Sequence, residues 1–329
     1  MAKTLLQVED LQVQFTQEDR VALGVKNVSF SVTEGVNLAL IGESGCGKSV
    51  TSLSCMRLLG NNGRISKGAI TFEDQDITRA GEKQMEKLRG RRMAMIFQEP
   101  MTSLNPVLTI NYQLSEALRL HTGMTKKEIR THCIQLLQQV GIPDMEKVLD
   151  GFPHELSGGM RQRVMIAMAL ACKPRLLIAD EPTTALDVTI QAQILSLLKK
   201  LQQETGVTIM IITHDFGVVA EIADEVVVMY AGYAVEQGAV HELFTDPLHP
   251  YTKGLLKSII PLNGTMNSQL YAIPGMVPAM TLEQTGCPFH DRCSDKRSRC
   301  EKEFPSLRER TVGHLVRCFV GEGGYERAC

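Results

Sequence analysis

The chain has 329 residues, of which 43% are hydrophobic, and 35 basic residues against 37 acidic ones give a formal net charge of −2. This is enough apolar material for one large domain or two smaller ones, and the balanced charge argues against a nucleic-acid partner, which usually requires a basic excess. No window approaches the about 18 consecutive apolar residues of a membrane helix, and the N-terminal segment lacks the apolar core of a secretory signal. We therefore expect a cytosolic protein that would meet a membrane only from its surface.

Taken in chain order, the sequence alternates strand and helix patterns. Short β-type runs separated by turn signals fill residues 4–41 and end in Leu38–Ile41, after which a helical pattern covers Val50–Leu59. Apolar residues spaced three and four apart predict helices over 113–120 and 126–140. Alternation then resumes with strand 176–179, helix 188–204, strand 207–212, helix 216–223 and strand 225–230. This order predicts an α/β fold with parallel strands, followed by a linker over 261–286.

A glycine-rich segment with a lysine and a serine follows the run Leu38–Ile41. It matches the phosphate-loop pattern G-x-x-x-x-G-K-[ST] in its proper context, after a strand and before a helix. Glycines let backbone N–H groups turn toward phosphate oxygens, and the helix N-terminus adds partial positive charge. The lysine reaches the β- and γ-phosphates, and the serine hydroxyl binds Mg²⁺. The predicted ATP-binding residues here are Gly42, Glu43, Ser44, Gly45, Cys46, Gly47, Lys48, Ser49 and Val50.

Two adjacent carboxylates end the apolar run that begins at Leu176. The carboxyl ends of strands are where α/β sheets present ligand-binding groups. Asp180 is placed to hold Mg²⁺, and Glu181 is placed to orient or deprotonate the water that attacks the γ-phosphate. A helix cap is the structural alternative for this pair.

A third motif narrows the class of nucleotide hydrolase. The run Leu156, Ser157, Gly158, Gly159 and Met160 resembles the signature motif of ABC ATPases, with methionine where glutamine is commonest. In family order, Gln98 resembles the Q-loop glutamine, Asp187 lies in a D-loop-like Ala185-Leu186-Asp187, His214 resembles the switch histidine, and Phe15 resembles the aromatic residue that stacks on adenine. The resemblance implies that Gln98, Glu181 and His214 are catalytic and that Ser49, Gln98 and Asp180 hold Mg²⁺. It also implies a head-to-tail dimer in which each signature motif contacts the ATP bound to the partner's phosphate loop.

The match extends to a subfamily. The segment 98–106 and the run His249-Pro250-Tyr251-Thr252 are similar to those of dipeptide and oligopeptide importer ATPases, and related nickel, glutathione and metallophore importers share much of this pattern. The resemblance implies a peripheral ATPase on the cytoplasmic side of the bacterial inner membrane. Its implied partners are a second ABC ATPase chain (a paralogue or another copy), two transmembrane permease subunits and an extracytoplasmic solute-binding protein.

Four of the nine cysteines, Cys287, Cys293, Cys300 and Cys318, gather near the C-terminus with the spacing C-x5-C-x6-C-x17-C. In a reducing compartment such a set suggests metal before disulfide. Zinc, an iron–sulfur cluster and free, partly buried thiols all remain open from the residues themselves, although zinc sites favour closer cysteine pairs. The similarity of this tail to the C-terminal extension of oligopeptide-importer ATPases implies a [4Fe–4S] cluster.

The expected organisation is therefore an ABC-type P-loop ATPase domain over residues 1–260, with a helical subdomain at about 100–165, and a cysteine-rich C-terminal extension over 261–329. The alternative function is an ABC ATPase of DNA repair or translation, but such proteins typically carry long coiled-coil insertions or two cassettes in one chain. A regulatory module that binds ATP without turnover is disfavoured because both Glu181 and His214 are present.

Overall fold

The computed structural model describes residues 3–18, 20–98, 103–184, 186–258, 271–278, 280 and 284–320. The chain divides into two compact units, each of which is discontinuous in sequence. We call them the helical unit (Met1–Leu6, Val32–Asn37 and Phe72–Ile212) and the sheet unit (Gln7–Ser31, Leu38–Thr71 and Thr213–Cys329). The predicted domain boundary at residue 260 is not tested by this division and stays a prediction.

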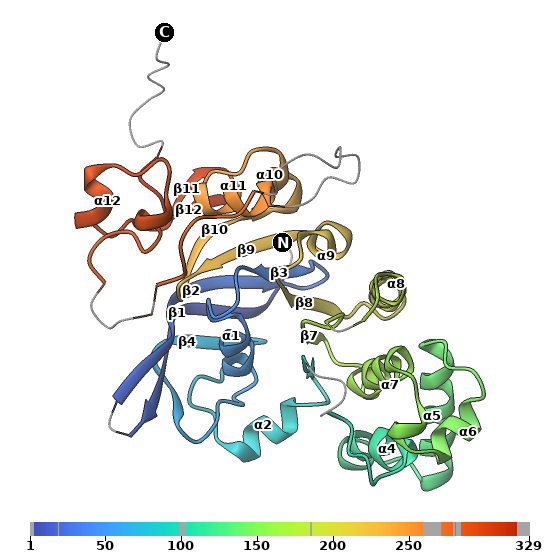
Figure 1. Cartoon of the computed structure of the whole chain (residues 1–329). Helices are drawn as coiled ribbons and strands as arrows, with labels where there is room; N and C mark the ends of the chain where they lie inside the picture. Colours follow the sequence, from blue (N-terminus) through green and yellow to red (C-terminus); the bar gives the residue numbers. More distant parts are fainter. Residues whose placement is uncertain are drawn as a thin grey trace. The chain divides into compact units, whose positions relative to one another are not determined.

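The sheet unit contains most of two long strands and all the C-terminal elements (Figure 1). Its hydrogen-bonded strand order is β4-β1-β2-β10-β9-β3. The strands are β1 (Thr4–Gln17), β2 (Arg20–Thr33), β3 (Leu38–Ile41), β4 (Gly63–Phe72), β9 (Glu225–Tyr230), β10 (Tyr233–Ala239), β11 (Arg308–Thr311) and β12 (His314–Val316). The helices are α1 (Lys48–Cys55), α9 (Phe216–Ile222), α10 (Val240–Thr245), α11 (Pro250–Lys257), α12 (Ser298–Lys302) and the 3₁₀ turn η2 (His290–Arg292).

The helical unit pairs β6 (Met93–Ile96), β7 (Leu176–Asp180) and β8 (Thr208–Thr213) in parallel, with β7 in the middle. All five residues of β7 and all six of β8 are buried, as expected for strands covered on both faces. The segment that joins β6 to β7 contains helices that pack against one another, drawn in green in Figure 1: α4, α5, α6 and α7. The remaining elements are the short β5 (Gln75–Asp76), α2 (Glu82–Leu88), α4 (Ile110–His121), α5 (Lys126–Gln139), α6 (Met145–Asp150), η1 (Pro153–Glu155), α7 (Gly158–Leu170) and α8 (Val188–Thr205).

Local signals place several of these boundaries. Thr125 and Glu128 form a capping box at the start of α5, and Gly206 ends α8 in the left-handed conformation, with φ 71°. One predicted boundary is wrong, because the helix expected over Val50–Leu59 already begins at Lys48 and ends at Cys55. Arg57 has a φ of 53°, which interrupts the helical backbone.

Two strands of the C-terminal region, β11 and β12, extend the sheet. Strand β12 pairs antiparallel with β10, with Val316 opposite Glu236, and β11 pairs with β12. His314 on β12 contacts the fully buried Glu236 on β10, with its Nε2 2.8 Å from Oε1. Glu236 also accepts hydrogen bonds from the backbone N–H groups of Leu248 (2.6 Å) and His249 (3.0 Å). Much of the predicted linker, residues 261–270, 279 and 281–283, lies outside the described residues.

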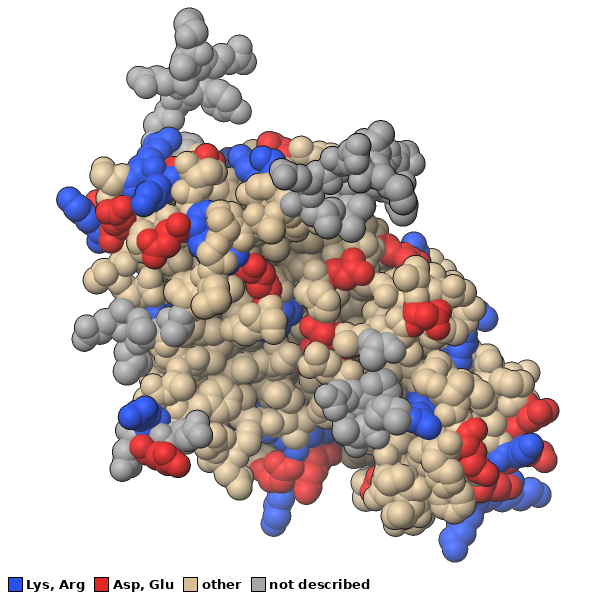
Figure 2. All heavy atoms as spheres, in the orientation of Figure 1, with Lys and Arg blue, Asp and Glu red and all other residues tan. Residues whose placement is uncertain are grey.

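Charged side chains of both signs are interspersed on the face that Figure 2 presents, and neither sign forms a continuous field over the described residues there. Within the described parts of the chain, no helix combines the length and the apolar character needed to cross a membrane.

Candidate functional site

The phosphate loop closes around its own lysine. Lys48 is buried, and its Nζ donates hydrogen bonds to the carbonyl oxygens of Gly42 at 2.7 Å and Glu43 at 3.1 Å. Gly45 and Gly47 have φ values of 79° and 103°, which favour glycine. A Cβ at Gly47 would lie 2.6 Å from the carbonyl oxygen of Gly24, so the loop also requires glycine for space. This curled backbone is the cradle that phosphate oxygens need.

The other predicted residues of the sheet unit lie beside or apart from this loop. Cys46 is fully buried, and burial raises the pKa of its thiol, so this side chain fills space and is not a reactive group. The half-buried ring of Phe15 packs over Gly24, which Val50 also approaches. The adenine-stacking candidate and the start of α1 therefore lie side by side. His214 is exposed immediately after β8.

In the helical unit, the Q-loop glutamine and the acidic strand end come together. Gln98 Nε2 donates to Glu181 Oε2 at 3.0 Å, and the hydroxyl of Thr184 donates to the same oxygen at 2.8 Å. Glu181 has a φ of 46°, an unusual backbone conformation for this residue type that often accompanies function. Asp180 is buried at the end of β7. Residues 99–102, which follow Gln98, lie outside the described part of the chain.

The signature motif forms the N-terminus of α7. Ser157 caps the helix, with its hydroxyl accepting a hydrogen bond from the Met160 N–H at 3.3 Å, and both Ser157 and Gly158 are exposed. Gly159 faces Ile190 of α8, where a Cβ would come within 3.1 Å of that side chain. The predicted D-loop residue Asp187 caps α8 by accepting from the Ile190 N–H at 2.9 Å, while Ala185 lies outside the described residues. The serine therefore fills the helix-cap role and remains open to an external anion.

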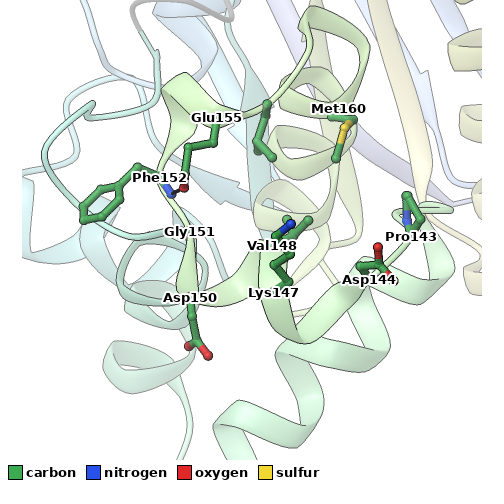
Figure 3. A pocket seen from close by; sticks show the side chains of 10 residues that line it. Pro143, Asp144, Lys147, Val148, Asp150, Gly151, Phe152, Glu155 and Met160 are labelled. Carbon is green, nitrogen blue, oxygen red and sulfur yellow. Dashed lines mark hydrogen bonds between the residues drawn. The ribbon is translucent and has the colours of Figure 1, made fainter.

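A hollow of about 560 Å³ lies beside the signature motif, between α6 and α7 (Figure 3). Leu156 and Met160 line it together with the segment between Pro143 and Glu155. The carboxylate of Glu155 accepts a hydrogen bond from the Phe152 N–H at 2.7 Å, which closes the turn before the motif. The Met160 side chain thus forms part of the wall of the hollow, while its backbone N–H donates to the hydroxyl of Ser157 at the helix start.

The four C-terminal cysteines converge without forming a recognisable metal site. Charges on Cys293, Cys300 and Cys318 each act to raise the pKa of Cys287, after the larger effect of burial, so the four thiols lie near one another. The sulfurs of Cys300 and Cys318 accept hydrogen bonds from the N–H groups of Arg297 (3.4 Å) and Val320 (3.3 Å). Among the described residues, however, no three histidine, cysteine or acidic side chains are placed so that they could hold one metal ion. The expectation of a cluster is therefore not supported by this geometry.

Two side chains from the C-terminal region contact Glu43 of the phosphate loop, and the sequence did not predict either contact. Arg292 of η2 binds the carboxylate of Glu43 in a bidentate pair, with distances of 2.7 and 3.0 Å. The hydroxyl of Tyr251 accepts a hydrogen bond from the Glu43 N–H at 2.9 Å. No local sequence signal could have found them, because 249 residues separate Glu43 from Arg292.

A phosphate loop wrapped on its lysine, and a buried parallel strand that ends in two acids, define a P-loop nucleoside triphosphatase. Residues 25–184 match the family model described as ABC transporter, and residues 235–300 match the model described as the C-terminal region of oligopeptide/dipeptide transporters. The chain belongs to the ABC transporter ATP-binding proteins, in the group that carries the oligopeptide/dipeptide C-terminal region.

Individual relatives agree with this assignment. The chain is 51% identical to the oligopeptide transport ATP-binding protein AppD of Bacillus subtilis, over 97% of both chains. It is 48% identical to the dipeptide transport ATP-binding protein DppD of Escherichia coli, over 95% of this chain and 96% of that protein. Among solved structures, it is similar to the dimeric ATP-binding cassette MJ0796 bound to ADP and phosphate (TM-score 0.65, 26% identity, 72% of this chain and 99% of that chain). It is also similar to cbiO1 from Clostridium perfringens (TM-score 0.63, 31% identity, 74% and 91%).

Proposed function

We propose that this chain hydrolyses ATP to drive the import of peptides through a membrane transporter. The observation that carries the proposal is the near full-length similarity to the oligopeptide and dipeptide transport ATP-binding proteins, including the C-terminal region. The retention of Lys48, Glu181 and His214 supports turnover over mere binding, since each is the residue type that hydrolysis needs.

In the proposed mechanism, the loop Gly42–Val50 binds the phosphates and Phe15 stacks on the adenine. Glu181, steadied by Gln98 and Thr184, orients and deprotonates the attacking water. His214 contacts the γ-phosphate and responds to its loss. The oxygen donors of Ser49, Gln98 and Asp180 are of the kind that Mg²⁺ prefers, and the ion would neutralise charge on the phosphates.

The exposed start of α7 is proposed to contact the ATP held by a second ATPase chain. Its N–H groups and glycines suit an anion. The γ-phosphate then holds two chains together, and its loss releases them. Asp187 would shape that dimer contact. The partners in this proposal are a second ATPase chain, two permeases and an extracytoplasmic binding protein, with this chain peripheral on the cytoplasmic side of the membrane and no nucleic acid involved.

The decisive test of turnover is Glu181→Gln in the transporter assembled with its permease subunits. We expect release of phosphate to fall by about 100-fold or more, the usual contribution of a general base, while ATP remains bound. Glu204→Gln on α8 is the matched control, because Glu204 pairs only with Lys200 on the same exposed helix face at 3.8 Å among the ion pairs described. Unchanged turnover in Glu181→Gln would remove that residue from the mechanism.

The cargo is tested separately by uptake. Cells that lack this chain, complemented with wild type or with Glu181→Gln, are supplied with labelled dipeptides, labelled oligopeptides, nickel, glutathione or a metallophore. Peptide uptake restored by wild type alone supports the proposal. Restoration of nickel, glutathione or metallophore uptake without peptide uptake would assign the same motor to the related importers.

We further propose that Cys287, Cys293, Cys300 and Cys318 form a [4Fe–4S] site, with zinc or no metal as the alternatives. The convergence of the thiols and the N–H groups directed at two of the sulfurs support it, although the described arrangement does not fit a metal and the thiols would have to move. Anaerobic purification followed by visible absorbance and iron, sulfide and zinc analysis separates the three outcomes. Equal amounts of iron and sulfide would establish the cluster. Zinc without iron would establish a structural zinc site. A protein that contains no metal would exclude both kinds of site.

A further inference from the structure

An arginine of the C-terminal region holds the phosphate loop at Glu43. The side chain of Arg292 is only 5% exposed. Its Nη1 donates to Oε2 of Glu43 at 2.7 Å, and its Nη2 donates to Oε1 at 3.0 Å. Bidentate pairs of this kind combine charge with a defined orientation and are stronger than single contacts. The paired glutamate is the second residue of the loop Gly42–Ser49.

The arginine is itself held rigidly. Its Nε donates to the carbonyl oxygen of Pro274 at 2.8 Å, and its guanidinium carbon lies 5.7 Å from the ring centre of Tyr230 and 5.9 Å from that of Phe289. Tyr230 and Phe289 meet edge to face, with ring centroids 5.2 Å apart. The guanidinium therefore sits in a built pocket of aromatic rings and carbonyl oxygens and is not a loose surface charge.

Glu43 is fixed at two points. Arg292 binds its carboxylate, and the hydroxyl of Tyr251 accepts from its backbone N–H at 2.9 Å. Tyr251 is fully buried and packs against Tyr230, with ring centroids 4.7 Å apart. Side chains from α11 and from η2 thus converge on a single residue of the loop, and all of these residues belong to the sheet unit.

The ion pair between Arg292 and Glu43 affects the charge that the phosphate loop presents to a nucleotide. A loop that binds the phosphates of ATP carries a carboxylate at Glu43, which would repel them if it were uncompensated. Arg292 compensates that charge, and the fixed loop loses less conformational freedom when ATP binds. We propose that Arg292 is a positioning residue for ATP binding, through which the C-terminal region sets the affinity of the phosphate loop.

This inference rests on the proposed binding of ATP by the loop. It is tested by measuring the Kd of the full-length chain for Mg-ATP by isothermal titration calorimetry, for wild type, Arg292→Met, Glu43→Gln and the double variant. We expect Arg292→Met to weaken binding about tenfold, since it leaves an uncompensated charge in the loop. Glu43→Gln placed in the Arg292→Met background should recover at least half of that loss on a logarithmic scale, because it removes the charge that Arg292 balances.

Arg308→Met is the matched control, an exposed arginine of the same C-terminal region, and we expect its Kd within twofold of wild type. Arg292→Lys should retain part of the affinity, because it supplies the charge without the bidentate geometry. If wild type itself does not bind Mg-ATP, the proposed function fails. If wild type binds and Arg292→Met binds equally well, or if Glu43→Gln recovers nothing, the inference is overturned and Arg292 only supports the tail.

Discussion

The buried residue His249, at the start of α11, makes the stability of the folded chain depend on pH in a way that can be tested. The residue is 1% exposed, and its Nδ1 accepts a hydrogen bond from the Tyr251 N–H at 3.0 Å as the cap of α11. Burial lowers the pKa of His249 to about 4, from the ordinary value of 6.5. We consider His249→Asn, because asparagine is a good helix cap that does not titrate in this range.

Whether acid stabilises or destabilises the folded chain depends on which state, folded or unfolded, binds the proton at the higher pH. The unfolded chain protonates His249 near pH 6.5, whereas the folded chain resists protonation down to about pH 4, so acidification destabilises the folded wild type across this window. With these two values, the loss is about 1.4 kcal/mol at pH 5.5 and about 2.5 kcal/mol at pH 4.5. The His249→Asn variant does not lose this stability on acidification, because asparagine does not titrate in this range. At pH 7.5 it is less stable by about 1–2 kcal/mol, because it lacks the imidazole ring, whose centroid lies 5.8 Å from that of Phe289.

The two stability curves should therefore converge near pH 5.5, with the variant the more stable protein at pH 4.5. Because the chain contains no tryptophan, guanidinium unfolding is followed by far-ultraviolet circular dichroism at pH 7.5, 6.5, 5.5 and 4.5. His241→Asn, at an exposed position of α10, controls for loss of a histidine as such. A constant difference between wild type and His249→Asn at all four pH values would refute the reasoning.

Further outcomes are expected at His314, the phosphate loop, the buried thiols and α5. The hydrogen bond to Glu236 raises the pKa of His314. Protonated His314 therefore stabilises the folded chain fully below about pH 6.5, and this stabilisation is lost as the pH rises through the folded-state pKa. The free energy of unfolding of His314→Gln should approach that of wild type in alkaline solution. Gly47→Ala should cost about 1–3 kcal/mol in backbone strain and sharply weaken ATP binding in calorimetry, and retained affinity would contradict the tight contact with Gly24. Burial raises the pKa of Cys55 to about 12 and also raises that of Cys46, so mass spectrometry should find both unmodified by N-ethylmaleimide at pH 8 until the chain is unfolded. Thr125→Ala should lower stability by about 1 kcal/mol through the lost cap of α5, whereas Thr131→Ala within the same helix should cost less.

The local structure at the phosphate loop, at the end of β7 and at the start of α7 could be predicted from the sequence. The phosphate loop, the two acids at the end of β7 and the serine before α7 are each defined by a few adjacent residues, because the turn or helix start they build depends on backbone geometry within that short stretch. The strands and helices from Leu176 to Tyr230 were predicted within two residues for the same reason: an apolar run or a helical spacing reports burial directly.

Contacts between distant segments were decided only by the tertiary structure. Nothing near Arg292 in sequence indicates that it binds Glu43, and nothing near His314 indicates that it meets Glu236, 78 residues away. Cysteine spacing likewise could not predict that the four thiols, although near one another, are not placed to hold one metal ion. Such contacts depend on how whole strands pair and pack, here β12 on β10 and η2 against the loop before α1, and a local pattern carries no information about that pairing.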